Sequence, residues 1–318
     1  MSWEPSADLE RLRARAALLG ELRVFFAERG VLEVETPLLC SAGVTDPALE
    51  PFLAGVVDSG ESEPRYLQTS PEYAMKRLLA AGSGPIFQIC KAFRQAELGA
   101  RHNPEFTLLE WYRPGFDHHA LMSEVIELIR RCLGQRALHK RSYRRWFQDL
   151  LEVDPFTASD AELEGLARAR LDVGSLAGGR DLWLDVLMTH LVEPQLAQLG
   201  MCLIYDYPAS QAALSRIAWV GNAEVGQRFE LYVDGMELAN GYFELTEAVE
   251  QRARFERDNL QRARQGLSAR PLDERLLAAM AQGLPSCSGV ALGVDRLLML
   301  RTGSADLREV VAFDWLRA

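Results

Sequence analysis

Near its C-terminal end the chain reads Ser288-Gly289-Val290-Ala291-Leu292-Gly293-Val294-Asp295-Arg296. Val290 to Leu300 predicts a short glycine-bearing strand that runs directly into a helix. Gly289 and Gly293 remove side chains from this strand, so we expect a flat ligand to approach its backbone. Arg296 falls in the first turn of the helix, where backbone amides and the helix dipole favour anions. The alternative is a tightly packed core strand with Arg296 in a structural ion pair.

Two more strands are predicted upstream, from Ile86 to Arg94 and from Glu105 to Tyr112. Because side chains alternate across a strand, the second strand should place four side chains on one face. These are Phe106, Leu108, Glu110 and Tyr112. A carboxylate on that face needs a cationic partner if it is buried. A lysine-like ligand or an arginine of the protein could supply the positive charge on Glu110.

The loop that joins these strands is rich in cationic and amide side chains. Arg94 ends the first strand, and Arg101, His102 and Asn103 follow in the loop. Two arginines and an asparagine at a sheet edge suit a nucleotide phosphate or a carboxylate. Ordinary solvation of the loop is the alternative.

A hairpin is predicted between Arg228 and Leu245, because Asp234-Gly235 is a strong two-residue turn signal. With Val233 and Met236 beside the turn, Tyr232 should face Glu237 and Glu230 should face Ala239.

This register places two carboxylates, Glu230 and Glu237, on one face as diagonal neighbours about 7–8 Å apart at the backbone. Two carboxylates at that spacing can hold Mg²⁺ while substrate phosphates complete its shell. A solvated acidic face is the alternative. Asn240 and Glu244 follow closely, and a candidate bulge at Gly241 leaves the face of Glu244 open.

The rest of the chain predicts helices with a few scattered strands. Apolar residues recur at helical spacing from Leu9 to Phe26, and Gly30 ends that helix. Ser70-Pro71 marks the start of a helix from Glu72 to Ala81. Residues 118–200 are expected to form a mainly helical insertion, to which no chemistry can be attached. Strands without regular strand–helix alternation favour an α+β fold with an antiparallel sheet, and residues 1–318 suit a single domain.

Composition excludes several classes of protein. No apolar run approaches the roughly 20 residues of a membrane span, so we expect a cytoplasmic protein without membrane contact. The net charge of −10 argues mildly against RNA as the main partner. Five cysteines without a CxxC pair favour neither disulfides nor zinc. The pair His118-His119 is expected in a solvated loop.

Three of these features, taken in order, resemble the motifs of class II aminoacyl-tRNA synthetases. The first helix through Val34-Glu35-Thr36-Pro37 resembles motif 1, which builds the dimer interface in that family. Phe93-Arg94 with Arg101 to Phe106 resembles motif 2, and Gly289 to Arg296 resembles motif 3. The resemblance implies the class II catalytic core, a mostly antiparallel sheet flanked by helices, and a homodimer.

The closest resemblance is to the lysine-specific branch. Thr69 to Glu72, His102 to Thr107 and Glu237 to Gly241 look like lysyl-tRNA synthetase. The resemblance runs from about residue 10 to the C-terminus, and we expect no anticodon-binding domain. This organisation is similar to the elongation factor P (R)-β-lysine ligase family, a group of lysyl-tRNA synthetase paralogues. Ala291 stands where lysyl-tRNA synthetases usually carry glycine, which implies a pocket reshaped for a β-amino acid.

The resemblance also implies a role for each matching residue. Arg94, Glu237 and Arg296 would be catalytic, with Arg94 on the α-phosphate and the substrate carboxylate and Arg296 on the γ-phosphate. Glu230 and Glu237 would hold Mg²⁺. The residues implied at ATP are Arg94, Arg101, Asn103, Phe106 (stacked on adenine), Glu237, Leu238, Gly293 and Arg296. Those implied at the amino-acid substrate are Ser70 and Glu72 for the backbone-side amine, and Glu110, Tyr112, Asn240 and Glu244 for the side-chain amine.

The implied reaction is ATP-dependent activation of (R)-β-lysine and transfer to a lysine of elongation factor P. The implied partners are that acceptor protein and lysine or β-lysine, with no stable binding of tRNA. The alternatives are a minimal lysyl-tRNA synthetase and a non-catalytic adenylate-binding module. One departure bears on them: motif 2 normally reads Phe-Arg-x-Glu, with the glutamate on the adenine amino group, and Ala96 stands at that place. Gln95 and Glu97 are the candidate substitutes.

Overall fold

The computed structural model describes residues 3–55 and 64–318. Within these ranges one large mixed sheet has the strand order β1-β5-β6-β12-β11-β10-β8-β7, and β9 pairs with β10. Its strands are β1 (Leu32–Glu33), β5 (Ile86–Phe93), β6 (Glu105–Pro114), β7 (Leu138–Ser142), β8 (Met201–Pro208), β9 (Ile217–Val220), β10 (Ala223–Val233), β11 (Met236–Phe243) and β12 (Cys287–Gly293). Only the β1–β5 and β7–β8 pairs are parallel among these described strands. The expected α+β fold with a mostly antiparallel sheet is confirmed.

A small second sheet has the order β2-β4-β3. Its strands are β2 (Leu39–Cys40), β3 (Leu53–Gly55) and β4 (Pro64–Leu67). Backbone bonds join it to the end of β5, because the Phe93 amide donates to the Gln68 carbonyl over 2.9 Å. This contact brings the residues just after β4 to the start of the loop between β5 and β6.

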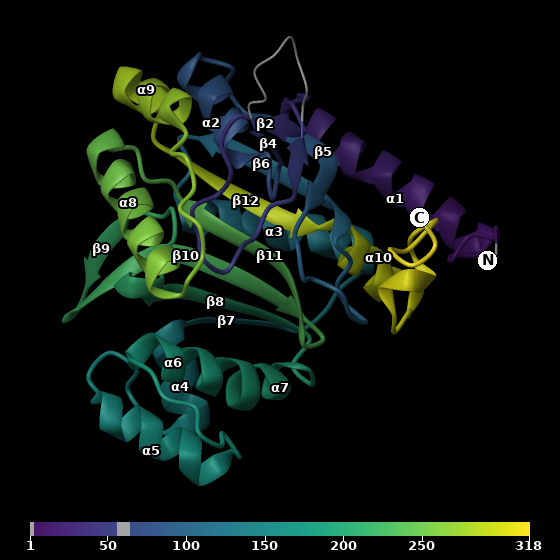
Figure 1. The fold of residues 1–318 in the computed structure, drawn as a ribbon. Helices are drawn as coiled ribbons and strands as arrows, with labels where there is room; N and C mark the ends of the chain where they lie inside the picture. Colours follow the sequence, from purple (N-terminus) through teal and green to yellow (C-terminus); the bar gives the residue numbers. More distant parts are fainter. Residues whose placement is uncertain (1–2, 56–63) are drawn as a thin grey trace.

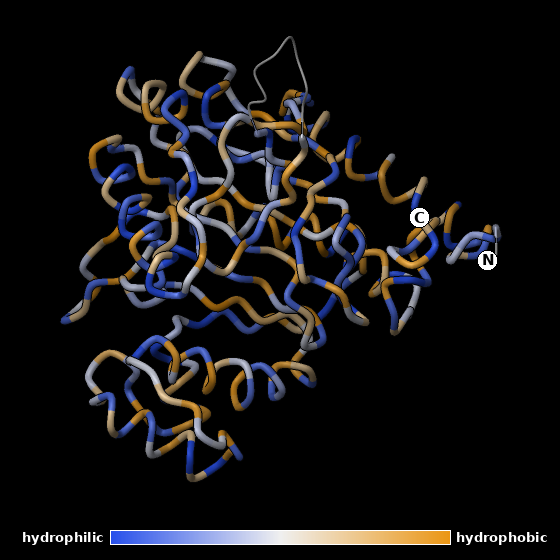
Figure 2. The backbone as a smooth tube through the Cα atoms, in the orientation of Figure 1, coloured by the Kyte–Doolittle hydropathy of each residue, from blue (hydrophilic) through white to orange (hydrophobic). Residues whose placement is uncertain are grey.

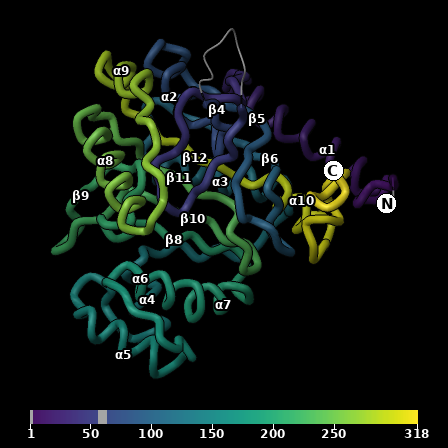
Figure 3. Tube along the Cα trace, in the orientation of Figure 1, coloured from purple at the N-terminus to yellow at the C-terminus, as the bar shows by residue number. Residues whose placement is uncertain are grey.

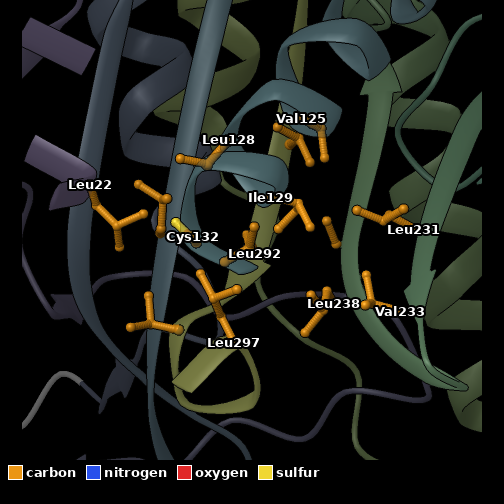
Figure 4. Close-up of a cluster of buried hydrophobic side chains, with 14 of the residues drawn as sticks. Leu22, Val125, Leu128, Ile129, Cys132, Leu231, Val233, Leu238, Leu292 and Leu297 are labelled. Carbon is orange, nitrogen blue, oxygen red and sulfur yellow. The ribbon is translucent and has the colours of Figure 1, made fainter. Parts of the chain in front are cut away.

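Three helices cover one face of the large sheet and enclose the main core. They are α1 (Leu9–Ala27), α3 (His118–Leu133) and α10 (Val294–Thr302). The apolar stripe of α1 inserts Leu22 and Phe26 between the sheet and α3, and both are fully buried. Figure 4 shows Leu22, Val125 and Leu231 among the side chains that meet there from helices and strands. Asp8 caps the first turn of α1 by accepting a hydrogen bond from the Arg11 amide.

The opposite face is covered at its two ends by separate helix groups, which leaves its middle for a site (Figure 1). At one end α2 (Glu72–Ala80), α8 (Ala248–Arg264) and α9 (Glu274–Gly283) pack together around Met75, Phe255 and Leu277. At the other end lie α4 (Tyr143–Leu151), α5 (Asp160–Arg170), α6 (Arg180–Leu187), the π-helix η1 (Met188–Val192) and α7 (Glu193–Leu196).

The helices α4 to α7 have a core of their own, in which Trp146 and Trp183 are completely buried. They lie beneath β7 and β8 (Figure 3), and both hydrophobic and hydrophilic segments run through them (Figure 2). The stretch 118–200 therefore has two parts. Helix α3 and strand β7 belong to the main core and the main sheet, whereas residues 143–196 form the added helical layer.

The hairpin of β10 and β11 forms at the expected turn, with positive φ angles at Asp234 and Gly235. The expected pairs Val233–Met236 and Tyr232–Glu237 are confirmed.

The expected pairing of Glu230 with Ala239 is wrong, because Glu230 lies opposite Asn240. The register shifts between Leu231 and Tyr232, so Leu238 is the extra residue of a bulge. The bulge is not at Gly241. Glycine is needed at 241 for another reason, since a Cβ there would lie 2.4 Å from the ring of Phe229.

The histidine pair also differs from expectation. His118 begins α3, is 3% exposed, and has its Nε2 3.3 Å from a carboxylate oxygen of Asp206. It therefore lies in the packed interior and not in a solvated loop. Separately, no helix in residues 3–55 or 64–318 is long and apolar enough to cross a membrane.

Candidate active site

Two cavities have volumes of about 400 and 270 Å³. The larger is lined by the small sheet, α2, α8 and nearby loops, with Tyr242 of β11, whereas the smaller lies on β6, β11 and β12. The smaller one collects all eight residues that the sequence assigns to ATP. These are Arg94, Arg101, Asn103, Phe106, Glu237, Leu238, Gly293 and Arg296. They come from the β5–β6 loop, β6, β11, β12 and α10, so the fold brings motif 2 and motif 3 together with the acidic hairpin.

Arg296 occupies the first turn of α10, as expected, and its guanidinium connects the motifs. It donates to the Glu237 carbonyl over 2.9 Å, and its Nη2 lies 2.6 Å from Nε2 of His102. Burial and the charge of Arg296 lower the pKa of His102, so the neutral ring can accept this hydrogen bond. A cationic side chain held in this way at a helix N-terminus is suited to a terminal phosphate.

The side chain of Asn103, which was assigned to ATP, already forms hydrogen bonds within the protein. The side chain of Asn103 donates to the Glu105 carbonyl over 2.6 Å and accepts from the Trp315 amide over 3.0 Å. It therefore also anchors the C-terminal segment.

Gly289 was expected to admit a flat ligand, and this is wrong. A Cβ at Gly289 would lie 2.2 Å from Tyr112 and 2.6 Å from Glu244, so the glycine makes room for protein side chains.

The acidic hairpin places Glu230 and Glu237 on one face, as expected. One carboxylate oxygen of Glu230 accepts from Tyr207 and Tyr232 over 2.7 and 2.8 Å, and the other accepts from Arg228. Burial and the negative charge of Glu230 raise the pKa of Glu237 to about 7.

These contacts leave ligand capacity for a cation. The oxygen of Glu230 that accepts only from Arg228 keeps one lone pair. One oxygen of Glu237 forms an ion pair with Arg296 over 3.7 Å, which leaves its other oxygen for a cation. The repulsion that raises the pKa of Glu237 is relieved when a divalent cation lies between the two carboxylates. The pair therefore fits Mg²⁺, with phosphate and water as the remaining ligands.

The substrate residues form two connected groups beside the larger cavity. In the first group Ser70 and Tyr112 each donate a 2.6 Å hydrogen bond to Glu110, one to each carboxylate oxygen. Glu110 is 2% exposed, and burial together with the charge of Glu72 raises its pKa to about 8. A buried carboxyl with a raised pKa is a group that a cationic ligand would stabilise.

The second group contains a residue that the sequence reasoning missed. Lys76 in α2 is 1% exposed, and its ammonium lies 2.6 Å from carboxylate oxygens of both Glu72 and Glu244. Burial raises the pKa of Glu244 to about 7, although the positive charge of Lys76 acts to lower it. The i, i+4 spacing of Glu72 and Lys76 was the available signal, but such a pair is usually a solvated one on a helix surface.

Ser70 and Glu72 line the larger cavity together with Tyr242, whereas Asn240 lines the smaller one. Glu110, Tyr112 and Glu244 are buried directly behind Ser70 and Glu72. A loop covers the larger cavity and is fastened to α8, because Thr45 donates to Asp258 over 2.7 Å.

The bulge at Leu238 decides which β11 side chains reach this face. Beyond it, Asn240 and Tyr242 lie on the same side as Glu237, while Ala239 turns into the main core. Without the extra residue this order would be reversed. Ala291 of β12 pairs with Asn240 on one side and with Glu110 on the other, and it lines the smaller cavity.

The structure of the motif 2 loop distinguishes between Gln95 and Glu97, the two candidates to replace the missing glutamate. Ala96 has a φ of 60°, the left-handed region that costs a non-glycine residue about 1 kcal/mol. Gln95 points out of the site and donates to the Pro51 carbonyl over 2.8 Å. Glu97 lines the smaller cavity, with a carboxylate oxygen 3.6 Å from Arg94.

Comparison with known proteins agrees with this geometry. A family model described as class II tRNA synthetases (D, K and N) matches residues 4–316. Proteins of Salmonella paratyphi B, Salmonella schwarzengrund and Salmonella gallinarum, each named elongation factor P–(R)-β-lysine ligase, are 50% identical to this chain over 322 aligned residues. The alignment covers 100% of this chain and 98% of each relative.

Proposed function

This chain is a ligase that belongs to the elongation factor P–(R)-β-lysine ligase family of class II synthetases, and we propose that it activates (R)-β-lysine with ATP and transfers it to a lysine of elongation factor P. The relatives carry that activity in their name. We further propose that Mg²⁺ assists the reaction, that the chain acts in the cytoplasm as a homodimer, and that it binds no tRNA stably.

The observation that carries the substrate class is a charge imbalance. Glu72, Glu110 and Glu244 lie together, and Lys76 is the one cation that forms ion pairs with them in the described part of the chain. When all three are ionised, two negative charges remain. The pKa values of Glu110 and Glu244 are raised first by burial and also by the neighbouring charge of Glu72. A diamino acid supplies two ammonium groups and balances the two negative charges.

In the first step the substrate carboxylate attacks the α-phosphorus of ATP, and pyrophosphate leaves. Arg94 lines the smaller cavity and donates from its Nε over 3.4 Å to the carbonyl of Thr69, which lines the larger one. It would hold both the carboxylate and the α-phosphate. Arg296 would hold the departing pyrophosphate. The protein needs no covalent nucleophile, because the chemistry requires positioning and neutralisation of charge.

Mg²⁺ held by Glu230 and Glu237 would neutralise charge on the phosphates. In the second step the neutral amine of the acceptor lysine attacks the acyl carbon, AMP leaves, and an amide bond forms. The acceptor amine must lose a proton before it attacks.

The preference for β-lysine is supported by Ala291 and by the relatives. The Ala291 methyl group lies in the strand between Asn240 and Glu110, and so adds bulk beside the residues assigned to the amino acid. Homodimer formation through motif 1 is supported by exposed apolar side chains there, namely Leu9 and Val24 of α1 and Leu32 of β1.

The deciding experiment measures transfer of labelled (R)-β-lysine and labelled α-lysine to purified elongation factor P and to bulk tRNA in parallel. We expect transfer of β-lysine to the protein and none to tRNA. Charging of tRNA with α-lysine at a comparable rate would instead establish a minimal lysyl-tRNA synthetase. Binding of ATP and lysine isomers without release of pyrophosphate would establish a non-catalytic module.

A further inference from the structure

The smaller cavity offers one benzene ring and one available carboxylate near it. Among the described lining residues only Phe106 has a benzene ring, and such a face favours stacking of a flat base. Three carboxylates line the cavity. Asp295 is 2% exposed and bonded within the protein, and Glu237 belongs to the proposed metal pair. Glu97 is the carboxylate that remains for a base.

Arg94 marks the position that a base would take. Its guanidinium carbon lies 5.0 Å from the centre of the Phe106 ring, and its Nη1 lies 3.6 Å from Glu97. A guanidinium is flat and donates N–H bonds at its edge, and adenine does the same through its 6-amino group. A base stacked on Phe106 therefore has the Glu97 carboxylate at its edge, and displacement from the ring frees Arg94 for the phosphate.

The backbone explains why residue 97 is available for this role. The left-handed turn at Ala96 separates the directions of its neighbours, so Gln95 bonds to Pro51 while Glu97 enters the cavity. Ala96 itself has no side-chain acceptor.

We propose that Glu97 accepts a hydrogen bond from the 6-amino group of adenine and thereby selects ATP. This inference rests on the proposed use of ATP in this cavity. A carboxylate attracts an amino group and repels the 6-oxo oxygen of hypoxanthine. The free energy of a hydrogen bond to a charged group corresponds to an affinity about 10–100-fold higher for ATP than for a nucleotide without the 6-amino group.

The test is equilibrium binding of three nucleotides, measured by calorimetry without amino acid or acceptor. ATP carries the 6-amino group, purine riboside triphosphate lacks it, and inosine triphosphate has oxygen there. The wild-type protein should prefer ATP to the other two by about 10–100-fold. Glu97→Ala should bring the ratio of ATP to purine riboside triphosphate close to one. Glu97→Gln keeps the shape and can also donate, so it should bind inosine triphosphate relatively better.

Gln95→Ala is the matched control and should keep the wild-type ratios, because Gln95 bonds outside the cavity. Equal weakening of all three nucleotides by Glu97→Ala would overturn the proposal, since it would mean that Glu97 only positions Arg94. A wild-type protein that binds all three equally would overturn it too, while leaving ATP use intact. Failure of the wild-type protein to bind any nucleotide would instead refute the proposed function.

Discussion

The buried carboxyl of Glu110 should make binding of the amino acid depend on pH. Its pKa of about 8 means that it carries a proton at neutral pH, whereas an ammonium ligand requires the ionised form. Because the carboxyl pKa is raised, affinity should increase as pH rises and level off above pH 8. The free-energy cost of ionising Glu110 falls by about 2.3 kcal/mol between pH 6 and pH 8, which corresponds to about 50-fold in Kd.

Titration calorimetry with (R)-β-lysine, without ATP, measures both this slope and the accompanying proton release. At pH 7 about 0.9 of a proton should leave Glu110 on binding. The heat should therefore vary with the ionisation enthalpy of the buffer. Glu244, with its pKa raised to about 7, can only add to the release.

The matched variants lie on one strand. Glu110→Gln keeps one acceptor oxygen for Ser70 or Tyr112, while its NH2 group donates to the other hydroxyl. Because it cannot titrate, it should bind more weakly at pH 8 and lose about 0.9 of the released proton. Glu105→Gln changes an exposed carboxylate of the same strand and should behave as the wild type does. A wild-type Kd that is flat from pH 6 to pH 8, or a Glu110→Gln protein that keeps the full proton release, would refute the reasoning.

Four further substitutions test other parts of the site. Lys76→Met leaves Glu72 and a buried Glu244 without their cation, so urea unfolding at pH 8 should show a loss of about 3–5 kcal/mol; unchanged stability would mean that the ion pairs contribute nothing net. Gly289→Ala forces a Cβ to 2.2 Å from Tyr112, and pyrophosphate exchange should fall at least about 10-fold, with Gly20→Ala as the unhindered control. Glu237→Gln should lower adenylation about 100-fold without a change in melting temperature, and an unaltered response to a Mg²⁺ titration would contradict its metal role. Ala291→Gly should reduce the preference for β-lysine over α-lysine in the exchange assay by about 10-fold; an unchanged ratio would mean that this methyl group does not shape the pocket.

Much of the nucleotide site follows from the sequence. Each motif lies within one strand, loop or helix start, where periodicity states which side chains share a face. Phe106 and Glu110 share one face of β6, and Arg296 follows a glycine strand into the first turn of α10. The α+β class and the side chains that share a face could be predicted for this reason, whereas the assignment of eight residues to ATP came from the resemblance to class II synthetases.

The amino-acid side of the site depended more on tertiary structure. Glu72 and Lys76 look like a surface pair until α2 packs on the sheet and brings Glu244 to the same ammonium. Glycine is likewise required at position 289 because the Tyr112 side chain of the neighbouring strand occupies the space that a Cβ would need. Such contacts join segments far apart in the chain, so no local pattern encodes them.

By itself, then, the sequence determined which chemical groups this protein carries and which of them share a strand or a helix turn. The tertiary structure decided where those groups face. One extra residue at Leu238 turns Asn240 and Tyr242 toward the acidic face, and the left-handed turn at Ala96 sends Glu97 into the cavity. The physical reason is that side-chain direction alternates along a strand, so a local change of backbone reverses every position after it. Whether such a change occurs depends on the packing of neighbouring strands.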